Sequence, residues 1–182
     1  MRVIETQIPD VKVLIPKTFA DERGFFQETW NARVFAEHGL DLTFVQDNHS
    51  NSAKGVLRGL HYQIRYPQGK LMRVVRGCAF DVAVDLRRSS PTFRRWVGVE
   101  ISAQNKQMLW IPPGFAHGFL ALEDDTELLY KCTDYYAPED ERSLLWNDMN
   151  LAIQWPLPNG TAPRLSAKDM NGTSLAAAET FE

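Results

Sequence analysis

The residue types best suited to chemistry lie in the segment Gly55–Gln63, which places the imidazole of His61 and the guanidinium of Arg58 in one short apolar stretch. Imidazole titrates near neutral pH and suits proton transfer, whereas arginine binds phosphate or carboxylate through two parallel hydrogen bonds. The pair predicts a base that acts on a substrate carrying an anionic group. From this stretch alone, a core histidine whose ring is satisfied by the backbone is the alternative.

A second histidine, His117, follows the turn Pro112-Pro113-Gly114. This arrangement resembles the second motif of the cupin barrels, whose first motif carries two metal-binding histidines as His-x-His. Here the corresponding residues are His61-Tyr62-Gln63, so an amide replaces the second imidazole. Zinc and iron sites typically use at least three strong ligands. The sequence therefore predicts a barrel that has lost the metal and needs no cofactor.

Without a metal, His61 needs another group to raise its basicity, and a carboxylate that fixes its tautomer would do so. Asp169 is the candidate, accompanied by Lys168; an exposed aspartate at a helix start is the alternative. Tyr130 lies in an apolar run, where a tyrosine is usually part of the core. Further polar residues could hold a ligand or could simply be solvated surface: Arg23, Glu28, Gln46, Asp47, Asn48 and Lys70.

Short apolar runs separated by Gly and Pro predict a mainly β fold, an antiparallel sandwich or barrel. Strands are expected near residues 11–19, 24–30, 43–49, 55–64, 70–76, 78–86, 95–102, 107–111, 117–122 and 127–135. Residues 80–85 alternate apolar and polar or small side chains, which is typical of a half-buried strand. Strict alternation would put Arg58 and His61 on opposite faces, so a bulge at Gly59 is needed if both are to face one pocket.

One helix is expected, with Asn31 as its N-cap and Gly39 at its C-terminal end. The C-terminal third is rich in proline and reads as loops with short helical pieces. Its last ten residues or so are small and polar, and we expect them to be frayed.

The bulk properties predict a single domain covering residues 1–182. A net charge of −3 with mixed signs argues against binding to nucleic acid polymers. No apolar run is long enough to span a membrane, and the N-terminus lacks the apolar core of a signal peptide, so we expect a cytoplasmic protein. Cys78 and Cys132 lie in apolar runs and are expected to be buried thiols.

Taken together, these segments resemble the dTDP-4-dehydrorhamnose 3,5-epimerase family over nearly the whole chain. Each motif is weak alone, but they occur in the order typical of the family. They are Asp21–Phe26, Gln46–Ser50, Gly55–Gln63, Ile111–Phe119, Tyr130-Lys131, Tyr135–Pro138, Leu145–Asp148, Trp155-Pro156, Leu165-Ser166 and Lys168-Asp169.

The resemblance implies a cupin-like jelly roll and inversion at carbons 3 and 5 of dTDP-4-dehydro-6-deoxy-D-glucose. It implies His61 as the base, Tyr130 as the acid, Asp169 as the group that orients His61, and Lys70 as the cation that neutralises the enolate. It also implies a homodimer in which the segment with Arg23 and Glu28 reaches the pocket of the partner. The implied substrate-binding residues are Arg23, Glu28, Gln46, Asp47, Asn48, Arg58, Lys70, His117, Tyr136, Glu141 and Lys168.

Three alternatives stay open at this point. An enzyme that inverts a single carbon of a related dTDP-ketosugar would need a similar His/Tyr pair. A metal-dependent cupin oxygenase would lose activity on chelation. A non-catalytic barrel that binds sugars or nucleotides would bind ligand without exchanging protons.

Overall fold

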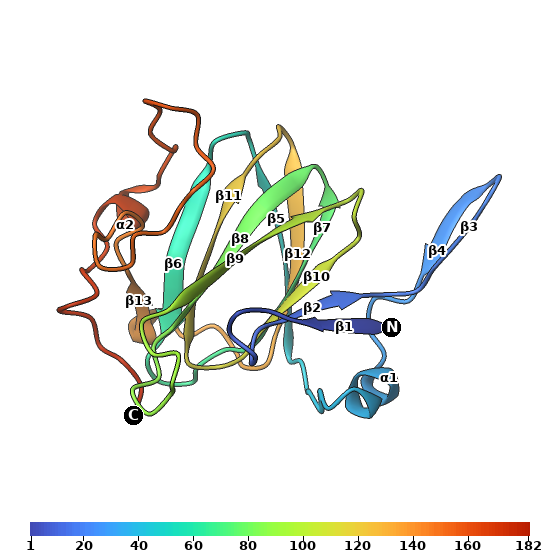
Figure 1. The fold of residues 1–182 in the computed structure, drawn as a ribbon, viewed down its shortest axis with the longest axis horizontal. Coiled ribbons are helices and arrows are strands. Elements are labelled where there is room, and N and C mark those ends of the chain that lie inside the picture. The colour runs from blue at the N-terminus through green and yellow to red at the C-terminus, as the bar shows by residue number, and fades with distance from the viewer.

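The computed structural model describes residues 1–182 and shows two antiparallel sheets stacked as a jelly roll, with a two-stranded hairpin projecting to one side (Figure 1). The predicted mainly β, jelly-roll architecture is therefore confirmed. No helix is long and apolar enough to cross a membrane.

The six-stranded sheet has the order β1-β2-β10-β7-β12-β5. Its strands are β1 (Arg2–Glu5), β2 (Lys12–Ile15), β10 (Met108–Ile111), β7 (Lys70–Arg76), β12 (Thr126–Cys132) and β5 (Gln46–Ser52). The five-stranded sheet has the order β13-β6-β11-β8-β9. Its strands are β13 (Glu141–Ser143), β6 (Leu57–Gln63), β11 (Phe115–Ala121), β8 (Cys78–Asp85) and β9 (Trp96–Ser102).

The strand expected over residues 11–19 is divided by Pro16 into β2 and β3 (Thr18–Asp21), because proline cannot donate a hydrogen bond to a sheet. β3 pairs only with β4 (Gly24–Gln27) and forms the projecting hairpin. The short strands β1 and β13 were not predicted. Both lie at sheet edges, where pairing to one neighbour allows a strand of three or four residues.

Helix α1 (Ala32–Glu37) begins as predicted, because the Asn31 side chain accepts hydrogen bonds from the N–H groups of Arg33 and Val34. The helix ends at a C-cap residue, His38, and Gly39 follows with a φ of +77°. The helix packs Phe35 against Trp30 on the outer side of the six-stranded sheet. A 3-10 turn (Pro138–Asp140) and helix α2 (Ala167–Met170) complete the elements.

The main core lies between the two sheets. It takes side chains from both of them and from the loop before β2: Ile8, Val11, Val13, Met72, Val74, Ala79, Ala83, Val97, Ile101, Leu109, Ile111, Phe115, Phe119 and Leu128. Apolar area removed from water stabilises such a core by about 25 cal/mol per Å².

Strand β8 corrects one expectation from the sequence, because both of its faces are buried rather than one. Val82 and Val84 point outward, where they pack against Leu175 and neighbouring residues of the C-terminal segment (residues 144–182). Asp81 and Asp85 occupy the other face and are fully buried. The alternation of side chains along β8 distinguishes two faces of the strand. The face that carries the larger apolar side chains is covered by the chain's own C-terminal segment.

The C-terminal segment is packed and not frayed, contrary to the prediction. The Leu175 N–H donates to Asp148 at 2.9 Å, and Leu175 is 3% exposed. Phe181 donates its N–H to the Leu86 carbonyl and accepts from the Arg88 N–H, at 3.0 and 2.8 Å. The small, polar composition of the tail suggested fraying, but its few apolar side chains cover an apolar outer sheet face.

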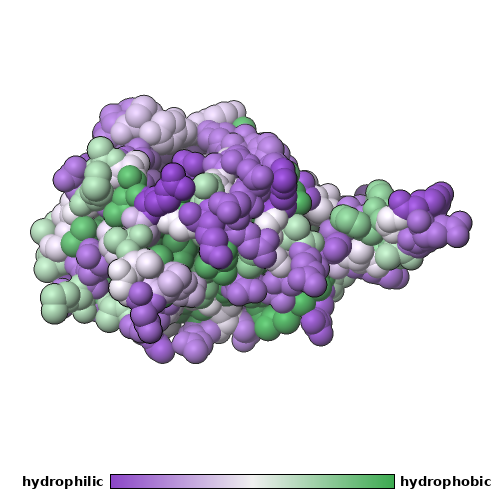
Figure 2. All heavy atoms as spheres, turned by 90° about the horizontal axis from the view of Figure 1, so that it is seen from above, coloured by the Kyte–Doolittle hydropathy of each residue, from purple (hydrophilic) through white to green (hydrophobic).

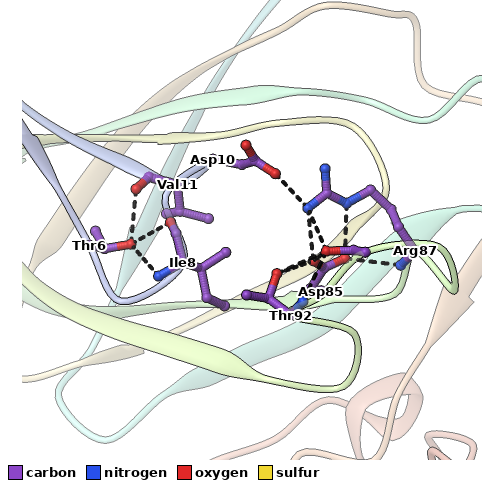
Figure 3. Close-up of polar contacts among 8 residues, drawn as sticks. Thr6, Ile8, Asp10, Val11, Asp85, Arg87 and Thr92 are labelled. Carbon is purple, nitrogen blue, oxygen red and sulfur yellow. Dashed lines mark hydrogen bonds and ion pairs between the residues drawn. The ribbon is translucent and has the colours of Figure 1, made fainter.

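A polar network joins the end of β8 to the N-terminal loop (Figure 3). The Arg87 guanidinium donates to Asp85 at 2.8 Å and to Asp10 at 2.7 Å. Arg87 also lies over the Phe115 ring and against Gly114, where a Cβ would approach the Arg87 Cγ to 2.6 Å. The network therefore fixes the start of β11, the strand that carries His117.

Candidate active site

A cavity of about 510 Å³ lies between the two sheets and is closed on one side by the C-terminal segment. It gathers nine of the predicted site residues from six elements and a loop. These are Arg58, His61, Lys70, His117, Tyr130, Tyr136, Glu141, Lys168 and Asp169. Residues far apart in the sequence therefore share one polar pocket.

Asp169 folds back onto His61, as the sequence analysis proposed. Its Oδ1 lies 2.7 Å from His61 Nε2 and also accepts the Gly59 N–H at 3.2 Å. Its Oδ2 accepts from the Ser166 hydroxyl at 2.6 Å, as part of a capping box at the start of α2. Asp169 is 3% exposed, so it is not an exposed helix-start residue.

The charge of Asp169 is well supported. Burial acts to raise the pKa of Asp169, but hydrogen bonds from His61, Ser166 and the Gly59 N–H outweigh it and lower that pKa to about 2. An ionised carboxylate only accepts hydrogen bonds, so it holds a hydrogen on Nε2 of His61 and leaves Nδ1 with a lone pair. That nitrogen is suited to take up a proton.

Arg58 and His61 both line the cavity because β6 contains the predicted bulge. Arg58 is opposite Phe119 and His61 is opposite His117, and the register shifts between these pairs. Gly59 has a φ of +128°, a region that favours glycine. The extra residue turns Arg58 toward the face that His61 already occupies.

Lys70 and Tyr130 come from the six-stranded sheet. Burial lowers the pKa of Lys70, while Cys132, Asp81 and Glu141 act in the opposite direction. Burial also raises the pKa of Tyr130, so its phenol keeps its proton at neutral pH. The cavity thus brings the His61 imidazole, the Tyr130 phenol and the Lys70 amine together.

Tyr136, Glu141 and Lys168 are linked at the cavity wall. The Lys168 ammonium lies 2.6 Å from Glu141 Oε1, and the Tyr136 hydroxyl donates to Glu141 Oε2 at 2.9 Å. Burial acts to raise the pKa of Glu141, but these hydrogen bonds outweigh it and hold that pKa below its usual range. The linkage ties α2 to β13 and so helps to place Asp169, the residue next to Lys168.

The cavity also contains residues that the sequence analysis missed. Arg164 lines it near Arg58, and Ser50 has a buried hydroxyl with no hydrogen-bond partner. Asp81 lies behind the wall, 2.9 Å from His117 Nε2. Arg164 stands in a proline-rich loop without periodicity, so the sequence carried no signal for it; Asp81 was visible only as a polar residue in a strand.

Five predicted binding residues do not line this cavity. Gln46 and Asn48 lie on β5 at its border: Gln46 accepts the Tyr136 N–H at 2.9 Å, and Asn48 is paired across from Tyr130. Asp47 points to the opposite face of the sheet, where it pairs with Lys131 at 2.7 Å.

The other two belong to the projecting hairpin and its base. Arg23 is at the hairpin tip, 84% exposed and paired only with Asp21, and Glu28 bonds to Asn31. Neither residue reaches the cavity of its own chain.

The donor set does not fit a catalytic metal. The structure contains no group of three or more His, Cys, Asp or Glu side chains placed to hold a metal ion. His61 and His117 each engage a carboxylate instead.

Comparisons with known proteins identify the family of this chain. The family model for dTDP-4-dehydrorhamnose 3,5-epimerase matches residues 5–177. A Shigella flexneri protein of that name is 56% identical, over 100% of this chain and 99% of its own length. A Neisseria gonorrhoeae protein of the same name is 59% identical over 98% of this chain, which spans about half (54%) of the length of that relative.

Solved structures give the same result. A Legionella pneumophila dTDP-6-deoxy-D-glucose-3,5-epimerase in complex with dTDP-4-keto-L-rhamnose has a TM-score of 0.94 and 51% identity, covering 98% of this chain and 94% of that one. A 3'-monoepimerase from Streptomyces bikiniensis in complex with dTDP-quinovose has a TM-score of 0.87 and 36% identity, covering 94% and 87%. The chain belongs to the dTDP-4-dehydrorhamnose 3,5-epimerase family.

Proposed function

We propose that this protein converts dTDP-4-dehydro-6-deoxy-D-glucose to dTDP-4-dehydro-L-rhamnose by inversion at carbons 3 and 5. The observation that carries the proposal is the His61–Asp169 pair, which shares one cavity with Tyr130 and Lys70. The carbonyl at carbon 4 acidifies the hydrogens on both neighbouring carbons, so one site can serve both inversions. The reaction moves only protons, and it therefore needs no cofactor.

Each group has a definite task in this proposal. His61 Nδ1 removes the proton from carbon, and the electron pair moves into an enolate whose oxygen is stabilised by the Lys70 ammonium. Tyr130 then delivers its proton to the other face of the same carbon. A well-placed base contributes on the order of 10²–10⁴ in rate, and a cation at the developing oxyanion adds a few kcal/mol. Asp169 keeps His61 in the required tautomer.

The cations at the cavity wall suit the nucleotide diphosphate. Arg58 is held by the Ser52 hydroxyl at 3.1 Å and the Asn51 carbonyl at 3.0 Å, which leaves its guanidinium fixed at the wall. We assign Arg58 and Arg164 to the diphosphate, because arginine binds such oxygens through paired hydrogen bonds. We assign the contacts to the sugar and the nucleoside to Gln46, Asn48, His117, Tyr136, Glu141 and Lys168. Asp47 could contact the substrate only if its side chain turned away from its present orientation.

We also propose a homodimer in which the β3–β4 hairpin of one chain completes the site of the other. The hairpin exposes three phenylalanines, Phe19, Phe25 and Phe26, to 54%, 62% and 70%. Figures 1 and 2 show it projecting from the body, with apolar residues along it and a hydrophilic tip. Such an apolar arm calls for a covering surface, and in a dimer it would carry Arg23 and Glu28 to the partner's pocket.

Coexpression of two inactive chains tests this arrangement. An Arg23→Ala chain lacks the contact that the β3–β4 hairpin would make with the substrate, and a His61→Asn chain lacks the base. If the arm acts on the partner, mixed dimers contain one intact site and activity returns. If the arm acts within its own chain, coexpression gives no more activity than the single variants.

A single-carbon epimerase is the second candidate, because the Streptomyces bikiniensis 3'-monoepimerase is structurally so similar. One experiment separates the two. The protein is incubated with dTDP-4-dehydro-6-deoxyglucose in deuterated water, and NMR detects the label. Deuterium at carbons 3 and 5 supports the proposed function, deuterium at one carbon supports the alternative, and binding without exchange rejects both.

The two buried free thiols, Cys78 and Cys132, fit a reducing compartment, and we place the reaction in the cytoplasm.

A further inference from the structure

A second histidine–carboxylate pair lies beside the first. His117 on β11 is directly opposite His61 on β6 and Ala83 on β8, so it is a diagonal neighbour of Asp81. Asp81 Oδ1 lies 2.9 Å from His117 Nε2. The two imidazoles therefore stand next to each other on neighbouring strands, and each has its Nε2 against a carboxylate.

The Asp81 side chain destabilises the folded state. It is fully buried, and its Oδ2 has no hydrogen-bond partner. A buried carboxylate costs free energy unless its oxygens are satisfied, and Ala79 and Ala83 show that this face of β8 accepts small apolar side chains. Packing does not explain a carboxylate here, and the hydrogen-bond partner of its side chain is His117.

The two histidines differ in their surroundings. The side chain of His61 is 23% exposed and that of His117 is 9% exposed. Burial lowers the pKa of His117, with Asp81 acting in the opposite direction and the nearby Lys70 and His61 side chains adding to the lowering. His117 is therefore neutral near pH 7 and carries a single ring hydrogen. An ionised Asp81 would hold that hydrogen on Nε2, because a carboxylate can only accept. Nδ1 is left as an acceptor.

We infer that Asp81 is a positioning residue that fixes His117 as an obligate hydrogen-bond acceptor for a hydroxyl group of the bound sugar. The inference rests on the proposed function, because an acceptor at this point of the cavity needs a ligand that carries hydroxyl groups. In this arrangement the two neighbouring histidines, His61 and His117, have different tasks. His61 takes a proton from carbon, whereas His117 stays neutral and orients the ring by accepting from a hydroxyl.

The tautomer can be read directly by nitrogen-15 NMR of the ligand-free protein. The chain has four histidines, so single His38→Gln, His49→Gln and His61→Gln variants identify the His117 ring. In the unchanged protein we expect the Nε2–H tautomer, without titration from mildly acidic to mildly basic pH. In Asp81→Asn the amide can donate to Nε2, so the Nδ1–H tautomer becomes populated.

Turnover gives the second readout. With its acceptor lost, Asp81→Asn should lower kcat/KM roughly 10- to 100-fold, which corresponds to about 1.4–2.7 kcal/mol for one lost hydrogen bond, while dTDP affinity is unchanged. Asp140→Asn is the matched control, because Asp140 is 1% exposed and also has one unpartnered oxygen, but does not line the cavity. It should leave the His117 tautomer and turnover unchanged.

A His117 that carries its hydrogen on Nδ1 in the unchanged protein overturns the inference, and this holds even if Asp81→Asn fails to fold. So does an Asp81→Asn variant with the original tautomer and normal turnover, or an equal loss of turnover in Asp140→Asn. An unchanged protein that binds dTDP but does not exchange protons in the keto sugar rejects the proposed function instead. The tautomer result is independent of that outcome.

Discussion

Gly59 and Gly118 cross so closely that a Cβ atom on Gly59 would lie 2.4 Å from the Cα atom of Gly118. This contact joins β6 to β11 at the point where their register shifts. It lets Arg58 and His61 face one cavity, and it presents the Gly59 N–H to Asp169. The position of His61 therefore depends on two residues that have no side chain.

Gly118→Ala tests that dependence. The added Cβ would meet the Arg58 carbonyl at 2.8 Å, so β6 must move away from β11. We expect a loss of about 1–3 kcal/mol in the free energy of unfolding, typical of overpacking, and a larger fall in kcat than in dTDP affinity. Denaturant unfolding and steady-state kinetics measure both. Gly160→Ala is the control: it meets open space at a φ of +76°, so it should cost about 1 kcal/mol and leave kcat unchanged.

His61→Asn should abolish deuterium exchange at the substrate carbons while the fold and nucleotide affinity remain. The amide cannot take up a proton, and a lost base typically lowers the rate on the order of 10²–10⁴. Exchange is followed by NMR, the fold by circular dichroism and nucleotide affinity by calorimetry. Near-normal turnover would show that another group is the base.

Tyr130→Phe should separate the two proton transfers. His61 remains, so the substrate still loses a proton to it and regains deuterium on the same face. The inverted product should form slowly, because the donor on the other face is missing. Comparison of exchange with product formation measures this. If product forms normally, another acid delivers the proton, with Tyr136 as the candidate in the same cavity.

The pH dependence should reveal Lys70. Burial lowers the pKa of its ammonium below the ordinary value of 10.5, so the stabilising charge is present below that lowered value and is lost as pH rises through it. We expect kcat to fall on the basic side before Tyr130 ionises, because burial raises the pKa of that phenol. In Lys70→Arg the charge persists, so the variant should be slower but lack this fall. The same basic fall in Lys70→Arg would assign it to another group.

The packed tail makes its own prediction. Phe181 is half-buried with its ring centroid 6.0 Å from that of Tyr62, and Phe181→Ala should cost about 1–3 kcal/mol of unfolding free energy. Met149→Ala is the control. Met149 is 92% exposed, so this substitution should leave the free energy of unfolding unchanged. Hydrogen exchange adds a direct measure, because the Phe181 and Arg88 amides should be protected. Fast exchange of both would mean that the tail is frayed after all.

Much of this molecule could be read from the sequence. The ranges of most strands followed from apolar runs between Gly and Pro, and α1 followed from its N-cap at Asn31. The need for a bulge at Gly59 followed from the period of a strand, because Arg58 and His61 are separated by an odd number of positions. Local chemistry decides such features, so local sequence shows them.

Other features required the tertiary structure. Alternation in β8 distinguished two faces but could not say that Asp81 faces the barrel interior, because that depends on which segment covers Val82 and Val84. That apolar face also orders the tail that covers it, although the composition of the tail indicated fraying.

The sequence by itself determined the kinds of groups available and the strands that carry them. Only the tertiary structure decided that Asp169 meets His61 across 108 positions, and that Arg164 joins Arg58 at the cavity. The physical reason is that long-range contacts form when separate surfaces bury one another, and no local pattern encodes which surfaces will meet.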